Sequence, residues 1–395
     1  MTEPNAKTST KTSTKTSTKV TNKVNAKALK LFTVTQGAER VCLQDLGRKQ
    51  SSQFGVSASG AADEYALLQA NHLVGNQAEE AALEVLLGNI EIAIHHTCQL
   101  VVTGANAAVN KRQTATQAAA EFTPPKADLT LNQETKDFWQ VITAQAGDIL
   151  RIAPLKVGNY AYLSVAGGFK HDNWFNSAIA KLSSQSTNNK LSAAPITDYF
   201  AATSTTTALR ESEKVPVRSE QLTTKKVTIK QVKTKQVVKN QTSYSNFYSL
   251  AGREQPFVAR FIANTYWQQL SATPQALLLA QTFSIDTSSN KMGYRVNLQS
   301  PNGAIKSAYQ ALADVSGNIS KPVVYGQIQL PSAEQWIVLM KDRQTIGGYP
   351  SIGTVMKTDL FRLAQLKPGQ KMRFQPINLA QAQAQLNAFY QRFGR

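Results

Sequence analysis

The groups best suited to chemistry stand together in one short segment, Asp342–Thr345, which contains an acid, a base, an amide and a hydroxyl in succession. The apolar run 336–340 precedes it and predicts a buried strand that would hold these groups in a fixed position. Gly347, Gly348 and Tyr349 follow, and glycine lets backbone approach a ligand closely. The alternative interpretation is a strand end followed by a polar tight turn.

Two further segments, residues 44–63 and 288–295, have the same character. In each, glycine and other small residues are interspersed with Asp, Arg, Ser or Asn. Backbone N–H groups and guanidinium groups suit an anionic or carbonyl-bearing ligand. The alternative for each neighbouring acid and arginine is a structural ion pair. None of the three segments matches a general catalytic motif.

Hydrophobic residues make up 42% of the 395-residue chain, enough for a packed core in one large domain or two. No apolar run reaches about 18 residues, so the sequence predicts no transmembrane helix. The N-terminus lacks the apolar region of a secretory signal, and we expect a cytoplasmic protein. Cys42 and Cys98 are expected to be buried free thiols. The four histidines lack metal-ligand spacing with a carboxylate, so no metal site is predicted.

The net charge of +18 is concentrated in two polar segments. Residues 1–30 contain seven lysines and one glutamate, a net +6. Residues 208–242 contain nine basic and three acidic residues, also a net +6. Neither segment has stacking aromatic residues beside it, which nucleic-acid recognition commonly uses. We interpret both as solvated segments, with no specific nucleic-acid partner and no membrane partner.

The chain divides by composition into five parts. Period-four repeats of Thr, Lys and Ser predict a disordered basic tail over 1–30. Strand-rich halves at 31–175 and 246–375 are separated by a polar low-complexity linker or insertion at 176–245. Residues 376–395, rich in Ala and Gln, predict a helical tail. This pattern favours a mostly β fold of paired barrels or sandwiches.

Local signals place individual elements on this outline. Asp63 predicts the N-cap of an amphipathic helix that ends at Gly75, with Ser57, Ser59 and Gly60 in the loop that enters it. Gly147-Asp148 predicts a hairpin turn. A second short helix is predicted at Asp359–Gln365. Runs of β-branched and aromatic residues predict strands at 31–35, 91–95, 99–103, 139–143, 149–153, 160–165, 257–261, 283–286, 294–298, 323–330 and 335–340.

Several common motifs are missing from the sequence. There is no G-x-x-x-x-G-K-[ST] phosphate loop and no G-x-S-x-G nucleophile elbow. Val355-Met356-Lys357 is similar to a biotin-bearing tripeptide, but Thr358 replaces the usual second methionine and a helix start follows. We interpret this match as coincidence.

The three polar segments, in this order and spacing, resemble the allophanate hydrolase subunit 2 or biotin-dependent carboxyltransferase family. Within it the chain is most similar to the C subunits of 5-oxoprolinases and to KipA-type proteins. The resemblance covers roughly 31–375, with 176–245 diverged. The stretches that carry it are V-C-L-Q-D-L-G-R from Val41, F-G-V-S-A-S-G-A-A-D from Phe54, L-L-Q-A-N-H-L-V-G-N from Leu67, Leu83-Glu84, V-T-G-A from Val102, Y-L-S-V-A-G-G from Tyr162, 289–295, 326–331 and D-R-Q-T-I-G-G-Y-P-S-I-G-T-V from Asp342.

The resemblance implies a fold and a reaction. The fold would be two tandem cyclophilin-like β-barrel domains with a few short helices. Together with 5-oxoprolinase partners of the A and B types, the chain would couple hydrolysis of ATP, with Mg²⁺, to opening of the 5-oxoproline ring to give glutamate. One alternative is a biotin-dependent carboxyltransferase of the urea or allophanate type, which needs a biotin carrier and biotin carboxylase elsewhere. The other is a KipA-type regulatory binding protein.

The resemblance also implies roles for individual residues. Arg343 and Arg48 would hold phosphate or carboxylate, Asp342 and Asp45 would orient those arginines or act as base or metal ligand, and Gln344 and Thr345 would bind the ligand amide. The substrate-binding set would be Ser57, Ser59, Gly60, Asp63, Arg295, Gly347, Gly348 and Tyr349.

The sequence departs from the family at three places. Lys49-Gln50-Ser51 stand where relatives usually continue with Pro or another residue followed by Gly-Tyr. Asn290-Lys291 replace an Asp-Arg pair, and 332–336 replace a Gly-x-Pro step. The loss of one acid–arginine pair would alter the substrate or weaken catalysis.

Overall fold

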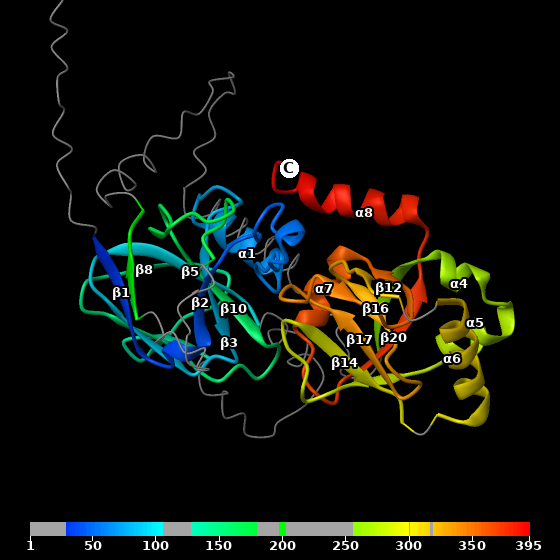
Figure 1. Ribbon diagram of the computed structural model, residues 1–395. Helices are drawn as coiled ribbons and strands as arrows, with labels where there is room; N and C mark the ends of the chain where they lie inside the picture. The colour runs from blue at the N-terminus through cyan, green and yellow to red at the C-terminus, as the bar shows by residue number, and fades with distance from the viewer. Residues whose placement is uncertain (1–28, 106–127, 180–196, 203–255, 300, 317–318) are drawn as a thin grey trace, which may run out of the picture.

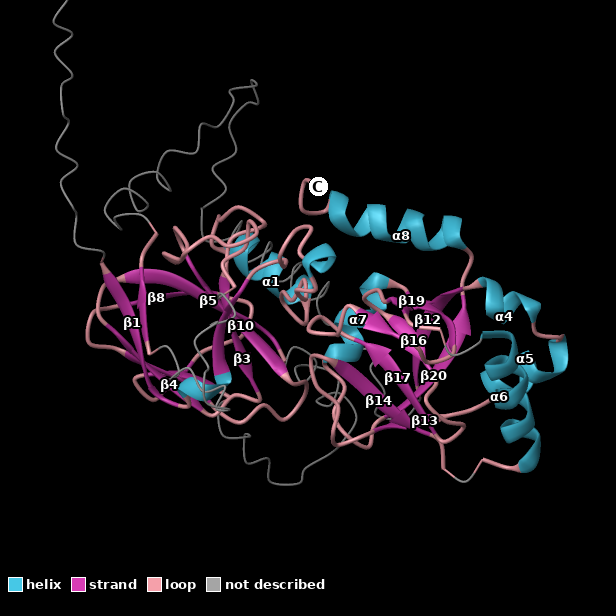
Figure 2. Cartoon of the chain, viewed as in Figure 1, coloured by secondary structure: helices cyan, strands magenta, loops and turns pink. Residues whose placement is uncertain are grey.

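The computed structural model describes residues 29–105, 128–179, 197–202, 256–299, 301–316 and 319–395 (Figure 1). The predictions for the basic tail, except its last two residues, and for residues 203–245 lie outside this described part. Two β-rich halves lie side by side, and the C-terminal helix runs above the second (Figures 1 and 2).

The first half consists of two antiparallel sheets around one apolar core. Their strand orders are β11-β1-β4-β9-β6-β7 and β2-β3-β10-β5-β8. Residues of one sheet alternate buried and part-exposed, as in β4, because only one face is covered. The strands are β1 (Lys30–Gln36), β4 (Ile90–Ile94), β6 (Leu129–Leu131), β7 (Glu134–Thr135), β9 (Ile149–Ile152) and β11 (Asp198–Phe200) in the first sheet, and β2 (Val41–Gln44), β3 (Ala82–Leu86), β5 (Cys98–Gly104), β8 (Val141–Ala144) and β10 (Tyr160–Val165) in the second.

Helix α1 (Glu64–Leu73) covers the outer face of the second sheet, so β10 is buried on both faces. The Asp63 carboxylate accepts a hydrogen bond from the Ala66 N–H at 3.1 Å, and Gly75 ends the segment with φ +75°. The predicted cap and stop of this helix are therefore confirmed. The same Asp63 carboxylate also accepts from the Gln365 amide of the second half, so the start of α1 contacts that half.

The second half is a closed barrel in the order β12-β19-β16-β17-β14-β13-β20. Its interior is aromatic, with Trp336 stacked on Phe374 at 5.4 Å between ring centroids. The barrel strands are β12 (Phe257–Ala263), β13 (Phe283–Ile285), β14 (Gly293–Asn297), β16 (Gln327–Gln329), β17 (Gln335–Leu339), β19 (Ser351–Val355) and β20 (Lys371–Pro376), with a separate ribbon of β15 (Lys321–Pro322) and β18 (Ile346–Gly347).

Helices surround this barrel on its outer side (Figure 2). In α6, Ile305, Ala308 and Leu312 are buried at helical spacing. The helices are α4 (Thr265–Gln269), α5 (Ala272–Leu279), α6 (Gly303–Ser316), α7 (Lys357–Ala364) and α8 (Leu379–Gln391), and two short 3₁₀ turns in the first half are η1 (Ala38–Arg40) and η2 (Ser52–Phe54). None of the helices in the described ranges is long and apolar enough to cross a bilayer.

The mostly β class with two tandem β domains is confirmed, but several local predictions were wrong. Gly147 does occupy a turn with φ +94°, yet the flanking strands form no hairpin. Strand β8 pairs with β5 and β9 pairs with β4, because the two strands belong to different sheets. The predicted strand 323–330 shortens to β16, since the residues before it leave the barrel wall toward β15.

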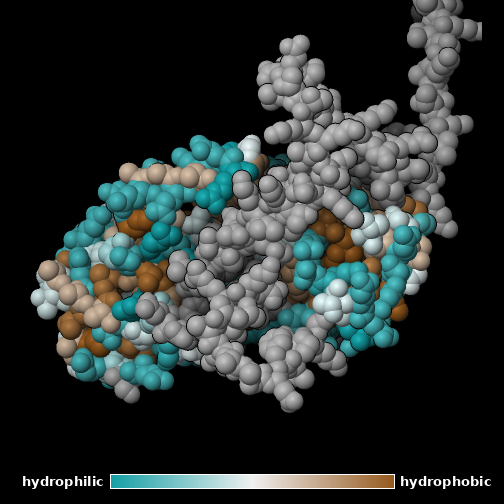
Figure 3. Space-filling view, turned by 180° about the vertical axis from the view of Figure 1, so that it is seen from behind, coloured by the Kyte–Doolittle hydropathy of each residue, from teal (hydrophilic) through white to brown (hydrophobic). Residues whose placement is uncertain are grey.

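Other elements were missed by the sequence interpretation. Helices α4, α5 and α6 and strands β2, β3, β19 and β20 were not predicted. Strand β11, within the predicted polar segment, adds an edge to the first sheet by pairing with β1. The domain boundaries themselves remain predictions. The rear view shows apolar residues interspersed with polar ones on the helix-covered end of the second half (Figure 3).

Candidate functional site at the domain interface

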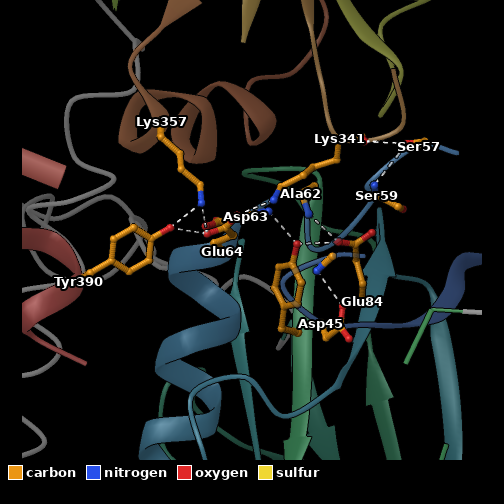
Figure 4. A network of polar contacts seen from close by, with 12 residues as sticks. Asp45, Ser57, Ser59, Ala62, Asp63, Glu64, Glu84, Lys341, Lys357 and Tyr390 are labelled. Atoms are coloured by element: carbon orange, nitrogen blue, oxygen red, sulfur yellow. Dashed lines mark hydrogen bonds and ion pairs between the residues drawn. The ribbon is translucent and has the colours of Figure 1, made fainter. Parts of the chain in front are cut away.

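A row of buried charged side chains joins the two halves (Figure 4). Glu64, the first residue of α1, is 1% exposed and forms ion pairs with Lys341 and, at 3.0 Å, with Lys357. The Tyr390 hydroxyl donates to the same carboxylate at 2.8 Å. Burial works to raise the pKa of Glu64, but Lys341 and Lys357 outweigh it and hold the pKa at about 2. One carboxylate of the first half thus binds two lysines of the second.

Lys341 is the more enclosed of these two lysines. It lies two residues after the end of β17, is 6% exposed, and its ammonium lies 4.8 Å from the centroid of the Tyr325 ring. Burial lowers its pKa, and Glu64 opposes that effect. Lys341 therefore depends on Glu64 to remain charged inside the protein.

A second buried carboxylate, Glu84 on β3, links the halves further along the row. It accepts from the Ala62 N–H at 2.9 Å and the Tyr162 hydroxyl at 2.7 Å, and it binds Lys291 at 2.8 Å. Burial works to lower the pKa of Lys291, but Glu84 and Asp342 outweigh it and raise the pKa. The expected loss of an acid–arginine pair at 290–291 is therefore only partial. Lys291 still provides a positive charge at this position, and it forms an ion pair with Glu84 of the other domain.

The loops at 45–48 and 57–61 of the first half pack directly on each other. The Arg48 N–H donates to the Ala58 carbonyl at 2.7 Å, and the Ala61 N–H donates to the Asp45 carbonyl at 2.8 Å. Gly60 has φ +108°, and a Cβ there would lie 2.8 Å from the backbone of Leu46. Gly60 thus lets its backbone approach the 45–48 loop of the same half closely, and this close contact is not with a ligand.

These loops reach across to the predicted 342–349 segment. The Ser57 hydroxyl donates to the Lys341 carbonyl at 3.1 Å, and the Ser59 hydroxyl donates to the Asp342 carboxylate at 2.5 Å. Ser59 holds φ at +52°, a conformation that costs free energy for a residue other than glycine. The structure therefore brings Ser57, Ser59 and Asp342 together across the interface.

The predicted pair of Asp45 and Arg48 has mainly local contacts. Asp45 accepts from the Gly47 N–H at 2.8 Å, the Ser177 hydroxyl at 2.8 Å and the Ala178 N–H at 2.7 Å. Arg48 donates to the Ser57 carbonyl at 3.0 Å. Burial lowers the pKa of Arg48, while Asp342 and Asp45 oppose this. In this structure Asp45 secures a loop, and Arg48 contributes positive charge near Asp342.

Arg343 is a cation of the site whose guanidinium is open, that is, without an ion-pair partner among the described residues. It is partly buried and lies over the Tyr325 ring at 6.0 Å. Within the described residues its guanidinium forms no ion pair, and its buried Nε has no hydrogen-bond acceptor. Burial lowers its pKa, which the Tyr325 hydroxyl opposes. Asp342 binds Ser59, so the adjacent acid and arginine do not form the structural ion pair that was the alternative for them.

The remaining predicted residues are distributed around this point. Gln344 and Tyr349 are exposed, Thr345 is half-buried, and Gly347 and Gly348 lie in or beside the β15–β18 ribbon. Asp63 caps α1 and accepts from the Gln365 amide at 2.8 Å. Their proposed contacts with substrate remain predictions.

Arg295 lies apart from this site. On β14 the preceding residue, Tyr294, faces the domain interface, where its hydroxyl accepts from the Asn159 amide of the first half at 3.1 Å. Successive strand residues point to opposite faces. Arg295 accordingly binds the Ser288 carbonyl, at 3.1 Å, in its own turn.

Glu64, Lys341, Tyr325 and Lys357 were missed as site residues. Lys341 had one usable signal, a lysine directly after a fully apolar strand. Lys357 was considered only as a biotin carrier; its ammonium contacts Glu64 and the Tyr390 hydroxyl, the latter at 2.6 Å, which does not fit that role.

The two thiols differ in exposure. Cys98 is 2% exposed, as predicted, whereas Cys42 is exposed because β2 is an edge strand, so that prediction was wrong. Crowding by protein atoms and the Glu84 carboxylate raise the pKa of Cys42 to about 11, which disfavours the nucleophilic thiolate. Across the described ranges, no cluster of three or more His, Cys, Asp and Glu side chains is arranged to hold a metal ion.

Comparison with known proteins identifies the family. The model of the carboxyltransferase domain, subdomains A and B, matches residues 54–376. The chain belongs to this carboxyltransferase domain family. The match contains the interface residues from Ser57 to Lys357, whereas Asp45, Arg48 and Tyr390 lie outside the matched range.

Relatives of this carboxyltransferase-domain protein include two that are named as the C subunit of 5-oxoprolinase. The one from Haemophilus influenzae is 26% identical over 343 residues, covering 87% of this chain and 90% of the relative. The one from Escherichia coli is 26% identical over 340 residues, covering 86% and 89%. Nearly the whole length of each relative is therefore matched.

Solved structures of two larger proteins share the fold. The Kluyveromyces lactis urea carboxylase has a TM-score of 0.61 at 19% identity, over 93% of this chain. The K. lactis urea amidolyase has a TM-score of 0.61 at 18% identity, also over 93%. This chain spans only 29% and 20% of those proteins, and 55% of a third solved structure with a TM-score of 0.59 at 20% identity.

The low pKa of Glu64 predicts acid sensitivity of the carboxyltransferase-domain protein. The folded-state pKa of about 2 lies below the ordinary value of 4.5. A carboxyl group whose pKa is lower in the folded state than in the unfolded state stabilises the fold at pH values above the unfolded-state pKa. That contribution is lost as the pH falls through the folded-state pKa. We expect stability to fall between pH 4.5 and 2 more steeply in the parent than in Glu64→Gln. Urea unfolding midpoints measured across this range check it, and parallel pH profiles would contradict it.

Proposed function

We propose that the chain is the C subunit of an ATP-dependent 5-oxoprolinase and acts with partners of the A and B types. Two relatives matched over almost their full length carry that subunit's name, which supports the proposal. The name implies partners, and ATP with Mg²⁺ would bind at the level of the assembled complex.

The observation that carries the proposal is the open guanidinium of Arg343 at the domain interface. A lactam amide is a poor electrophile, and phosphorylation of its carbonyl oxygen supplies a good leaving group. Donors that face developing negative charge stabilise such steps most. Arg343 would hold the substrate carboxylate or the phosphate, with Arg48 adding positive charge. Asp342, fixed by Ser59, would orient substrate or accept a proton.

The second candidate is a carboxyltransferase that acts on carboxybiotin and an amide such as urea. The family description and the shared fold with the K. lactis urea carboxylase favour it. Since Lys357 is engaged with Glu64, biotin would have to arrive on a separate carrier. A KipA-type regulatory role would instead leave the chain bound to its partner without turnover.

The test is ADP release by the chain mixed with its A-type and B-type partners, with and without 5-oxoproline. We expect 5-oxoproline to stimulate ADP release, with glutamate formed in step. Absence of stimulation while the chain still co-elutes with the B-type partner would contradict the proposal and favour the carboxyltransferase or regulatory function.

A further inference from the structure

Gln329 on β16 is a buried amide without a partner. It is 1% exposed, while its neighbours Ile328 and Leu330 point into the barrel core. By strand alternation Gln329 lies on the opposite face of the barrel wall. Neither its amide oxygen nor its amide nitrogen has a hydrogen-bond partner in the described ranges. Burying an amide without hydrogen bonds costs desolvation free energy, which an apolar residue of similar size would avoid. The amide is therefore expected to form hydrogen bonds with a bound ligand.

The Gln329 amide lies directly beneath the 342–349 segment. A Cβ on Gly347 would come 2.6 Å from the Gln329 Nε2 atom, so the amide lies against the Gly347 backbone. Gly347 belongs to the ribbon of β15 and β18, which pairs over two residues on each strand. So short a ribbon has little stability of its own. Displacement of this thin layer would open the amide to a ligand.

Two other unsatisfied polar groups belong to this segment or lie beside it. The Tyr325 hydroxyl is buried without a hydrogen-bond partner in the described ranges, and so is the Nε of Arg343. Three polar side chains under or on one segment therefore have buried atoms without partners. A ligand that displaces the ribbon would offer partners to these unpaired groups.

We propose that Gln329 recognises a cyclic amide, a lactam or a cyclic urea, beneath the β15–β18 ribbon. A primary amide offers a donor and an acceptor side by side. A ring amide is cis, so its N–H and C=O also lie side by side and pair with both atoms of Gln329. A trans amide places them on opposite sides and pairs with one. The choice of a lactam rests on the proposed function, whereas a cyclic urea corresponds to the carboxyltransferase alternative.

The experiment measures binding of 5-oxoproline, 2-pyrrolidone and biotin to the full chain by calorimetry. We expect at least one cyclic amide to bind and Gln329→Leu to weaken it by about tenfold or more, with a melting temperature equal to or above the parent's. Gln335→Leu, in the same barrel but bonded to Asn297, is the matched control and should bind as the parent does. 5-Oxoproline and biotin distinguish the two sources of the ring amide.

Three results would overturn the assignment: no binding of any cyclic amide to the parent, unchanged binding in Gln329→Leu, or a lower melting temperature of that variant with binding intact. Gln329→Leu in the reconstituted complex separates this inference from the proposed function. Turnover of 5-oxoproline that the variant leaves unchanged refutes the role of Gln329 alone. Binding of a ring amide without any turnover refutes the 5-oxoprolinase function alone.

Discussion

Replacing Glu64 by alanine is expected to lower the free energy of unfolding by about 3–5 kcal/mol. The substitution leaves the Lys341 ammonium, 6% exposed, without its carboxylate, and no other carboxylate contacts it within the described residues. A buried charge without a partner is among the most destabilising single changes. Urea unfolding followed by tryptophan fluorescence measures the effect. One apolar cluster contains residues of both halves, so they should unfold together.

Two further variants show whether burial is the cause. Glu79 pairs with Lys49 and Arg395 but is half-exposed, so Glu79→Ala should cost no more than about 1 kcal/mol. The double variant Glu64→Leu with Lys341→Met removes both buried charges and should recover most of the loss. If Glu64→Ala costs less than the Glu79 control, Lys341 reaches solvent without Glu64 and the buried pair does not hold the halves together.

Replacing Arg343 by alanine is expected to lower turnover of 5-oxoproline in the assembled complex by about 100-fold or more. Loss of one preorganised donor to developing negative charge has an effect of this size. Stability should change by less than about 1 kcal/mol, because the Arg343 guanidinium forms no ion pair and its buried Nε has no acceptor within the described part of the chain. Coupled ADP and glutamate assays measure turnover, and urea unfolding measures stability.

Arg295→Ala is the matched control for this prediction. Arg295 comes from the same set of predicted arginines but binds its own turn on the other face of β14. Its variant should keep turnover within about threefold of the parent. If Arg343→Ala also stays within about threefold, a cost below about 0.7 kcal/mol, Arg343 has no role in the transition state. Arg343→Lys should recover only part of the rate, since lysine keeps the charge without the planar fork.

The sequence alone determined the features that depend on neighbours along the chain. The cap at Asp63, the stop at Gly75 and the apolar strand before Lys341 follow from local hydrogen bonding and hydrophobic periodicity. The order of the polar motifs indicated the family, and the strand-rich runs of β-branched and aromatic residues indicated the mostly β class. Helix α6 could also have been predicted from the sequence, because Ile305, Ala308 and Leu312 stand at helical spacing.

Only the tertiary structure decided which charged groups meet. Lys341 binds Glu64 across 277 residues of sequence, and Lys291 binds Glu84 across 207. Asp342 and Arg343 are adjacent, yet one binds Ser59 and the other is left open over Tyr325. Sequence spacing predicts contacts only within one helix or strand, where backbone geometry fixes direction. Contacts between the domains depend on how two surfaces pack together, which local sequence does not encode, and at this interface the buried Nε of Arg343 is left without an acceptor in the described residues.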